Sequence, residues 1–103
     1  MARNSKTKAA KPLTTKTIAD GDIELSFYSF ERKEGITYTC AFKIMDAFVA
    51  YTRVIKGRNG WFISYPSYET KSGEFKDYIF CVDKDINAEI DLAVKEFADE
   101  YID

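Results

Sequence analysis

The 103-residue chain has no histidine, two cysteines, two prolines and no long apolar run, and each shortage excludes a class of protein. Without imidazole there can be no Ser/His/Asp triad, no Cys/His pair and no histidine-containing zinc site. Cys40 and Cys81 lie 41 positions apart, which matches no zinc or redox spacing, so we expect free thiols in a reducing, cytoplasmic compartment. The apolar runs are far shorter than the roughly 18 residues of a transmembrane helix. We therefore expect no membrane association, no enzyme activity and no cofactor or metal.

Charge is distributed unevenly along the chain, although the formal net charge is −2. The first 16 residues hold five bases and no acid, whereas residues 83–103 hold eight acids and two bases. Such asymmetry suggests contact with nucleic acid at the basic end, with a solubilising tail as the alternative. Residues 1–20 are rich in Lys, Thr, Ala and Ser and show no hydrophobic period, which predicts a flexible basic arm. Residues 21–103 are then the single domain.

Residues 22–82 show the period-two alternation of β-strands. Strands are predicted at 22–30, 36–44, 47–55, 61–65 and 75–82, with Cys40 and Cys81 both facing the core. Hairpin connections are predicted at 31–35, at Met45-Asp46 and at 56–60, where Asn59-Gly60 is a strong turn signal. Residues 67–73 are predicted as a polar loop. The pattern indicates five antiparallel strands joined as a meander.

After residue 82 the hydrophobic period changes from 2 to 3.6. Asp85 or Asn87 is the predicted N-cap of a helix. The fold class is therefore α+β, with a five-stranded antiparallel meander, one C-terminal amphipathic helix packed on it and a flexible basic N-terminal arm. One helix covers only part of a five-stranded face, so the remaining apolar faces and edges predict a homodimer. The apolar stripe of the helix consists of Ile90, Ala93, Val94, Phe97, Ala98 and Tyr101.

Between residues 44 and 95 the chain carries a series of residues in a distinctive order and spacing. They are Phe48-Val49, Arg53-Val54-Ile55, Asn59-Gly60, Phe62, Pro66-Ser67, Thr70, Gly73-Glu74-Phe75 and Asp77, then Ile90 and Ala93-Val94 in the helix. This series resembles the SpoVG family of bacterial septation and regulatory proteins. The resemblance implies a small dimeric β-sheet protein with a C-terminal helix that binds DNA or RNA. The N-terminal extension, Tyr65, Cys81-Val82 and the acidic end depart from the family pattern, which would suit a copy carried by a phage or mobile element.

Basic and aromatic residues gather between residues 53 and 76. Trp61, Tyr65 and Tyr68 lie near the bases and are predicted to stack on unpaired nucleotides, with packing in the core or at a dimer interface as the alternative. The bases form one positive rim if the hairpin at 56–60 lies beside the segment 67–76, and a solvated mixed-charge loop is the alternative. The predicted phosphate contacts are Arg53, Lys56, Arg58, Lys71 and Lys76.

Two functional hypotheses from different classes follow. The first is a non-enzymatic, homodimeric, cytoplasmic regulatory protein of SpoVG type that binds DNA or RNA. The second is a protein-interaction module, an inhibitor or adaptor, that engages a protein partner through its acidic helix face or an edge strand. Asp83, Asp85 and Asn87 alternate like a fragment of a calcium-binding loop, but the glycine and glutamate of such a loop are missing, so these residues are predicted to cap the helix.

Overall fold

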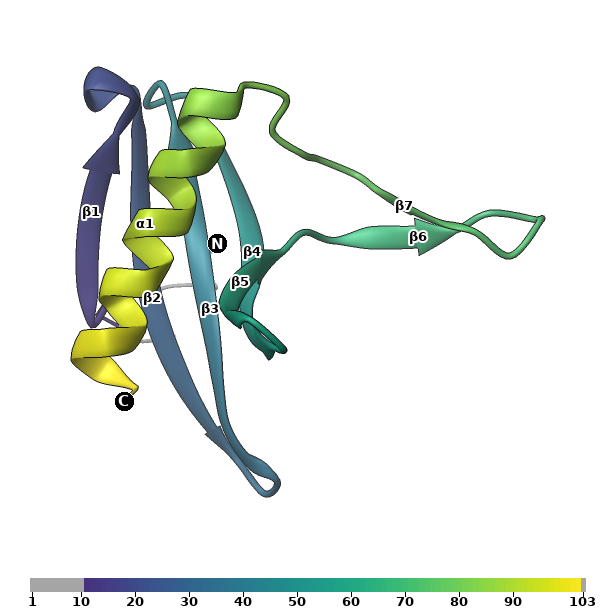
Figure 1. The fold of residues 1–103 in the computed structure, drawn as a ribbon, viewed down its shortest axis with the longest axis horizontal. Helices are drawn as coiled ribbons and strands as arrows, with labels where there is room; N and C mark the ends of the chain where they lie inside the picture. The colour runs from purple at the N-terminus through teal and green to yellow at the C-terminus, as the bar shows by residue number, and fades with distance from the viewer. Residues whose placement is uncertain (1–10, 103) are drawn as a thin grey trace, which may run out of the picture.

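The computed structural model describes residues 11–102 as an antiparallel sheet, a separate short hairpin and a long helix (Figure 1). In chain order the elements are β1 (Thr14–Ile18), the 3-10 turn η2 (Ala19–Gly21), β2 (Ile23–Arg32), β3 (Gly35–Ile44), β4 (Phe48–Gly57), β5 (Gly60–Ser64), β6 (Ser67–Glu69), β7 (Phe75–Asp77) and α1 (Lys84–Tyr101). The predicted α+β class, a five-stranded antiparallel meander with a C-terminal helix, is confirmed.

Strands β1 to β5 are hydrogen-bonded to one another in sequence order. The predicted connection at Met45-Asp46 is a tight turn in which both residues have positive φ, at 51° and 55°. The Ala47 N–H donates to the Ile44 carbonyl oxygen at 2.9 Å. This combination is typical of a type I′ turn, whose twist matches that of the flanking strands. The predicted β4–β5 hairpin is also present, with Gly57 opposite Gly60.

The first strand lies inside the segment predicted to be a flexible arm. β1 pairs antiparallel with β2, and the side chain of Ile18 is buried. On the same face of β1, Lys16 Nζ lies 3.4 Å from a carboxylate oxygen of Glu96 in α1. The prediction of an irregular arm is therefore wrong from Thr14 onward, because a strand with a single apolar side chain shows no hydrophobic period. Residues 1–10 of the predicted arm lie outside the described residues.

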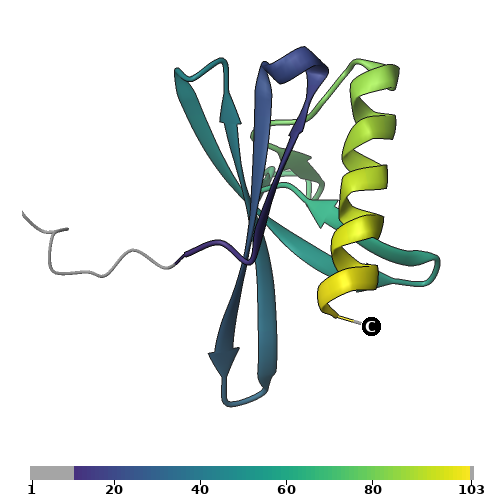
Figure 2. The ribbon, with the colours of Figure 1, turned by 90° about the vertical axis from the view of Figure 1, so that its left-hand side faces the viewer.

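Helix α1 packs against one face of the sheet and encloses the core between the two layers (Figure 2). At its centre Phe27 and Phe97 are both fully buried, and their rings stack with centroids 4.4 Å apart. The predicted stripe is confirmed except at Tyr101, which is 44% exposed. The helix begins earlier than predicted, because the Asp83 carboxylate accepts the N–H of Asp85 at 2.9 Å and that of Ile86 at 3.0 Å.

A hairpin made of β6 and β7 projects away from the main sheet (Figure 1). The predicted fifth strand, 75–82, is wrong beyond Asp77, because β7 pairs with β6 instead of the main sheet and residues 78–83 return to α1 without regular structure. The predicted loop 67–73 likewise contains β6. Cys81 is half-buried outside any strand. This course leaves large apolar side chains 63 to 82% exposed, namely Phe75, Tyr78, Phe80 and Val82.

Candidate nucleic-acid interface

Strand β4 divides the predicted basic residues between the two faces of the sheet. Thr52 and Val54 point toward α1 and are buried, so Arg53 between them points the other way. Lys56 lies on the α1 side, where its Nζ is 6.0 Å from the centroid of the Trp61 ring. The predicted single positive rim is therefore wrong, because Arg53 and Lys56 occupy opposite faces of one strand.

The other predicted bases lie at two further places. Arg58 belongs to the turn between β4 and β5. Lys71 lies in the connection of the β6–β7 hairpin, and Lys76 is opposite Tyr68 within it. In Figure 1 this hairpin extends well beyond the main sheet. All five bases are exposed, and within residues 11–102 none of them forms an ion pair.

The predicted stacking residues differ in how accessible their rings are. Trp61 packs edge-on against Tyr38 with ring centroids 5.7 Å apart, and its buried indole N–H has no acceptor in the described part of the chain. Tyr65 packs against Phe42 at 6.0 Å, and burial, followed by nearby ionisable groups, raises its pKa from 10.0 to about 12. Packing is thus the observed role of both residues. Tyr68, at 41% exposure, contacts Tyr78 on the β6–β7 hairpin.

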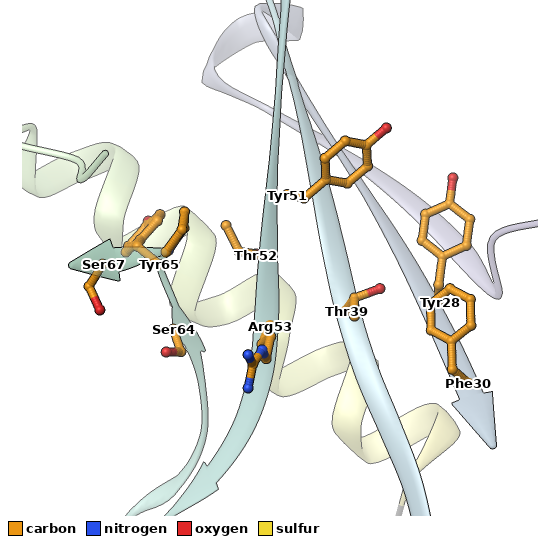
Figure 3. A pocket seen from close by; sticks show the side chains of 10 residues that line it. Tyr28, Phe30, Thr39, Tyr51, Thr52, Arg53, Ser64, Tyr65 and Ser67 are labelled. Carbon is orange, nitrogen blue, oxygen red and sulfur yellow. The ribbon is translucent and has the colours of Figure 1, made fainter. Parts of the chain in front are cut away.

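An open cavity of about 840 Å³ lies on the helix-free face, by which we mean the side chains of β2 to β5 that point away from α1 (Figure 3). It brings Arg53 and Tyr65 together from the predicted set, whereas the other six predicted residues lie elsewhere. The base of the β6–β7 hairpin closes one side through Pro66 and Ser67. The remaining lining residues are Tyr28, Phe30, Thr39, Tyr51 and Ser64, together with Thr52, although the Thr52 side chain itself points toward α1.

The lining combines aromatic rings, hydroxyl groups and one cation. Arg53 is its charged residue, and no Asp or Glu of the described residues lines the cavity. The rings of Tyr28 and Phe30 are nearly parallel, 20° apart, with centroids separated by 6.4 Å. Tyr51 is 73% exposed. Sequence reasoning missed these three aromatics, although strand alternation already placed them opposite the core positions.

Three further observations concern the buried cysteine, metal ligands and the helix. Burial raises the pKa of the Cys40 thiol from 9.0 to about 12, whereas a nucleophilic cysteine needs a lowered pKa. Within residues 11–102 there is no group of three or more His, Cys, Asp or Glu side chains that could hold a metal ion. Over the same residues, no helix is both long and apolar enough to cross a membrane.

Comparisons with a family model and with curated proteins return the same family description. Residues 22–100 match the family model described as SpoVG. A protein of Staphylococcus carnosus named "Putative septation protein SpoVG" is 43% identical over 56 residues, which are 53% of this chain and 52% of that protein. Proteins of the same name from Macrococcus caseolyticus and Staphylococcus aureus (strain JH9) are 41% identical, over 53% of this chain and 49% and 56% of their own lengths.

The alignments thus span about half the length of these curated relatives. The family model, by contrast, includes β2 to β7 and nearly all of α1, so it extends over the sheet, the projecting hairpin and the helix that packs on the core. Because that match covers far more than half of the sequence, the chain belongs to the SpoVG family.

Proposed function

We propose that this SpoVG-family protein is a non-enzymatic, cytoplasmic regulator that binds nucleic acid through phosphate contacts. The observation that carries the proposal is the pairing state of its charges. The five predicted phosphate contacts are exposed and make no ion pair within residues 11–102. Several acids of α1 are already engaged, since Glu96 and Glu100 lie near Lys16 and Asp99 lies 3.3 Å from Lys95. The five cations are therefore available to contact an anionic ligand.

We also propose that the protein works as a homodimer. The β6–β7 hairpin supports this, because an isolated two-stranded hairpin is at best marginally stable in water. Its exposed apolar side chains, together with those of residues 78–82, would be covered by a second copy. Light scattering after size-exclusion chromatography should give twice the chain mass. The double variant Tyr78→Ser/Phe80→Ser should give the mass of one chain, and a single-chain mass for the unmodified protein would contradict the dimer.

Fluorescence anisotropy with labelled single-stranded DNA, duplex DNA and RNA tests the binding proposal. We expect binding at about 50 mM salt that weakens steeply by about 200 mM, because phosphate contacts release counterions. Since the bases lie in four places, Arg53→Glu, Lys56→Glu, Arg58→Glu and Lys71→Glu/Lys76→Glu are measured separately. Each variant that removes a real contact should weaken every probe and lower the salt slope by roughly one per phosphate lost.

The matched control is Lys33→Glu, which makes the same charge change as the single variants in the exposed β2–β3 turn. Its affinity should stay close to that of the unmodified protein, whereas an equal loss would indicate an effect of net charge alone. Absence of binding to every probe at low salt would contradict the proposal. The protein-interaction alternative would then be favoured. It predicts that affinity capture returns one stoichiometric protein whether or not nuclease is added.

A further inference from the structure

The helix-free face differs from an ordinary solvent-facing sheet surface. Three aromatic side chains that point away from α1, those of Tyr28, Phe30 and Tyr51, line one open cavity there, and Tyr65, whose ring packs against Phe42, borders it. The first two lie on β2 and Tyr51 lies on β4, with the small side chain of Thr39 on β3 between them (Figure 3). The result is a shallow floor flanked by rings. Such a floor fits flat ligands laid across the strands.

The charge of the cavity selects an anionic occupant. Arg53 lies in the lining without a described ion-pair partner, and no carboxylate lines the cavity within residues 11–102. A second copy placed on this face by two-fold symmetry would bring two arginines into one contact with no acid from either cavity to neutralise them. An anionic ligand supplies the missing counter-charge. A phosphate of a nucleotide chain is therefore favoured over a second copy.

The aromatic rings add a second selection, between single strands and duplexes. Bases of a single strand expose their flat faces and stack on aromatic side chains without regard to sequence. In a duplex these faces are hidden between neighbouring base pairs. Tyr28 and Phe30 present nearly parallel rings, and Tyr51 is largely exposed beside Arg53. The rings can stack on the bases of a single strand while the neighbouring arginine contacts its phosphates. A duplex offers no exposed base faces for the rings to stack on.

We infer that the helix-free face is a single-strand binding site, in which Tyr28, Phe30 and Tyr51 stack on bases while Arg53 contacts the phosphate backbone. This inference rests on the proposed nucleic-acid binding and specifies the ligand as single-stranded. Thr39 and Ser64 supply hydroxyl groups in the same cavity that suit sugar or phosphate oxygens. Of the five bases in the proposed function, Arg53 is the one that lines this cavity, so it should contribute most to single-strand binding.

Strand β4 offers a matched pair of substitutions to test this inference. Tyr51 and Phe48 are 73% and 71% exposed, but they lie three positions apart on one strand and so belong to opposite faces. Tyr51→Ala, Tyr51→Phe and Phe48→Ala are compared by anisotropy on labelled oligo(dT) and oligo(U) of about 15 nucleotides and on a duplex of that length. Size-exclusion light scattering and Trp61 fluorescence report assembly and folding of each variant.

Tyr51→Ala should weaken binding of the better single-stranded probe roughly 5- to 150-fold, the loss of one base stack, and leave duplex binding within about twofold. Tyr51→Phe keeps the ring and should bind like the unmodified protein, as should Phe48→Ala. If the unmodified protein binds but Tyr51→Ala does not weaken the single strand, or weakens duplex equally, the inference fails and the proposed function stands. If the unmodified protein binds no probe, both fail. A change of mass in Tyr51→Ala would mean that a second copy occupies this face, which also overturns the inference.

Discussion

Replacing Phe97 by alanine should remove a large part of the free energy of unfolding. The side chain is fully buried, stacks on Phe27 at 4.4 Å and meets Tyr38 and Tyr101 at 5.9 and 5.4 Å. Truncating a buried phenylalanine costs about 3–5 kcal/mol, because transfer free energy is lost and a cavity remains. A domain of this size has a total stability of about 5–15 kcal/mol. The variant should therefore lose between a fifth and most of its stability.

Urea unfolding followed by fluorescence measures this loss directly, because Trp61 is the single tryptophan of the chain and packs against the same aromatic cluster. With a urea slope of about 2 kcal/mol/M, the midpoint should fall by roughly 2 M. Leu92→Ala, on the same helix at 56% exposure, is the control and should change stability by less than about 0.5 kcal/mol. All proteins are compared at one concentration, since self-association would add to apparent stability. A loss under about 1 kcal/mol in Phe97→Ala would refute the packing described between α1 and the sheet.

Three further predictions concern other parts of the fold. Ile18→Ala should destabilise the protein by about 2–4 kcal/mol in urea unfolding, because β1 anchors this buried side chain in the core; no change would contradict the strand. Asp83→Ala should cost about 1 kcal/mol in the same assay, with Asp83→Asn retaining most of the cap, and equal losses in both would argue against capping. Burial raises the folded-state pKa of Cys40 to about 12, so its thiol contributes stability below pH 9 that is lost as pH rises from about 9 to 12. Alkaline titration of the unfolding free energy should show a shallower decline in Cys40→Ala, and an unchanged slope would assign the decline to other groups.

The main sheet and the helix could be predicted from sequence because each of their elements buries several side chains at a regular period. β2, β3 and β4 bury alternate residues over their central parts, and α1 repeats its buried positions every three or four residues. β1 was not predicted because Ile18 is its one apolar side chain. Its strand conformation depends on pairing with β2, and a scan for local hydrophobic periodicity does not detect such pairing. The segment 75–82 is the opposite case. It is rich in apolar residues, yet it adds no strand to the main sheet, which ends at β5. Its residues Phe75–Asp77 pair with β6 instead.

The candidate site was predictable only in its composition. Basic and aromatic residue types between 53 and 76 were recognised, but the faces on which they lie depend on the register of β4. Arg53 and Lys56 are three positions apart in one strand, and this odd spacing alone separates them onto opposite faces. The aromatics that accompany Arg53 come from β2 and β4, across a register that the tight turns fix. A linear scan for bases near aromatics cannot find Tyr28, because it lies 25 positions from Arg53 in sequence.

Strand β4 shows how one short segment can serve stability on one face and binding on the other. Val54 is 4% exposed under α1, whereas Tyr51 is 73% exposed on the helix-free face. Val54→Ala should therefore lower the free energy of unfolding by roughly 2 kcal/mol, through lost burial and a small cavity, and leave the affinity per folded molecule unchanged. Tyr51→Ala should leave the unfolding free energy within about 0.5 kcal/mol while weakening single-strand binding. Urea unfolding and anisotropy on the same two preparations decide the matter, and equal destabilisation by both substitutions would show that the helix-free face belongs to a packed interface.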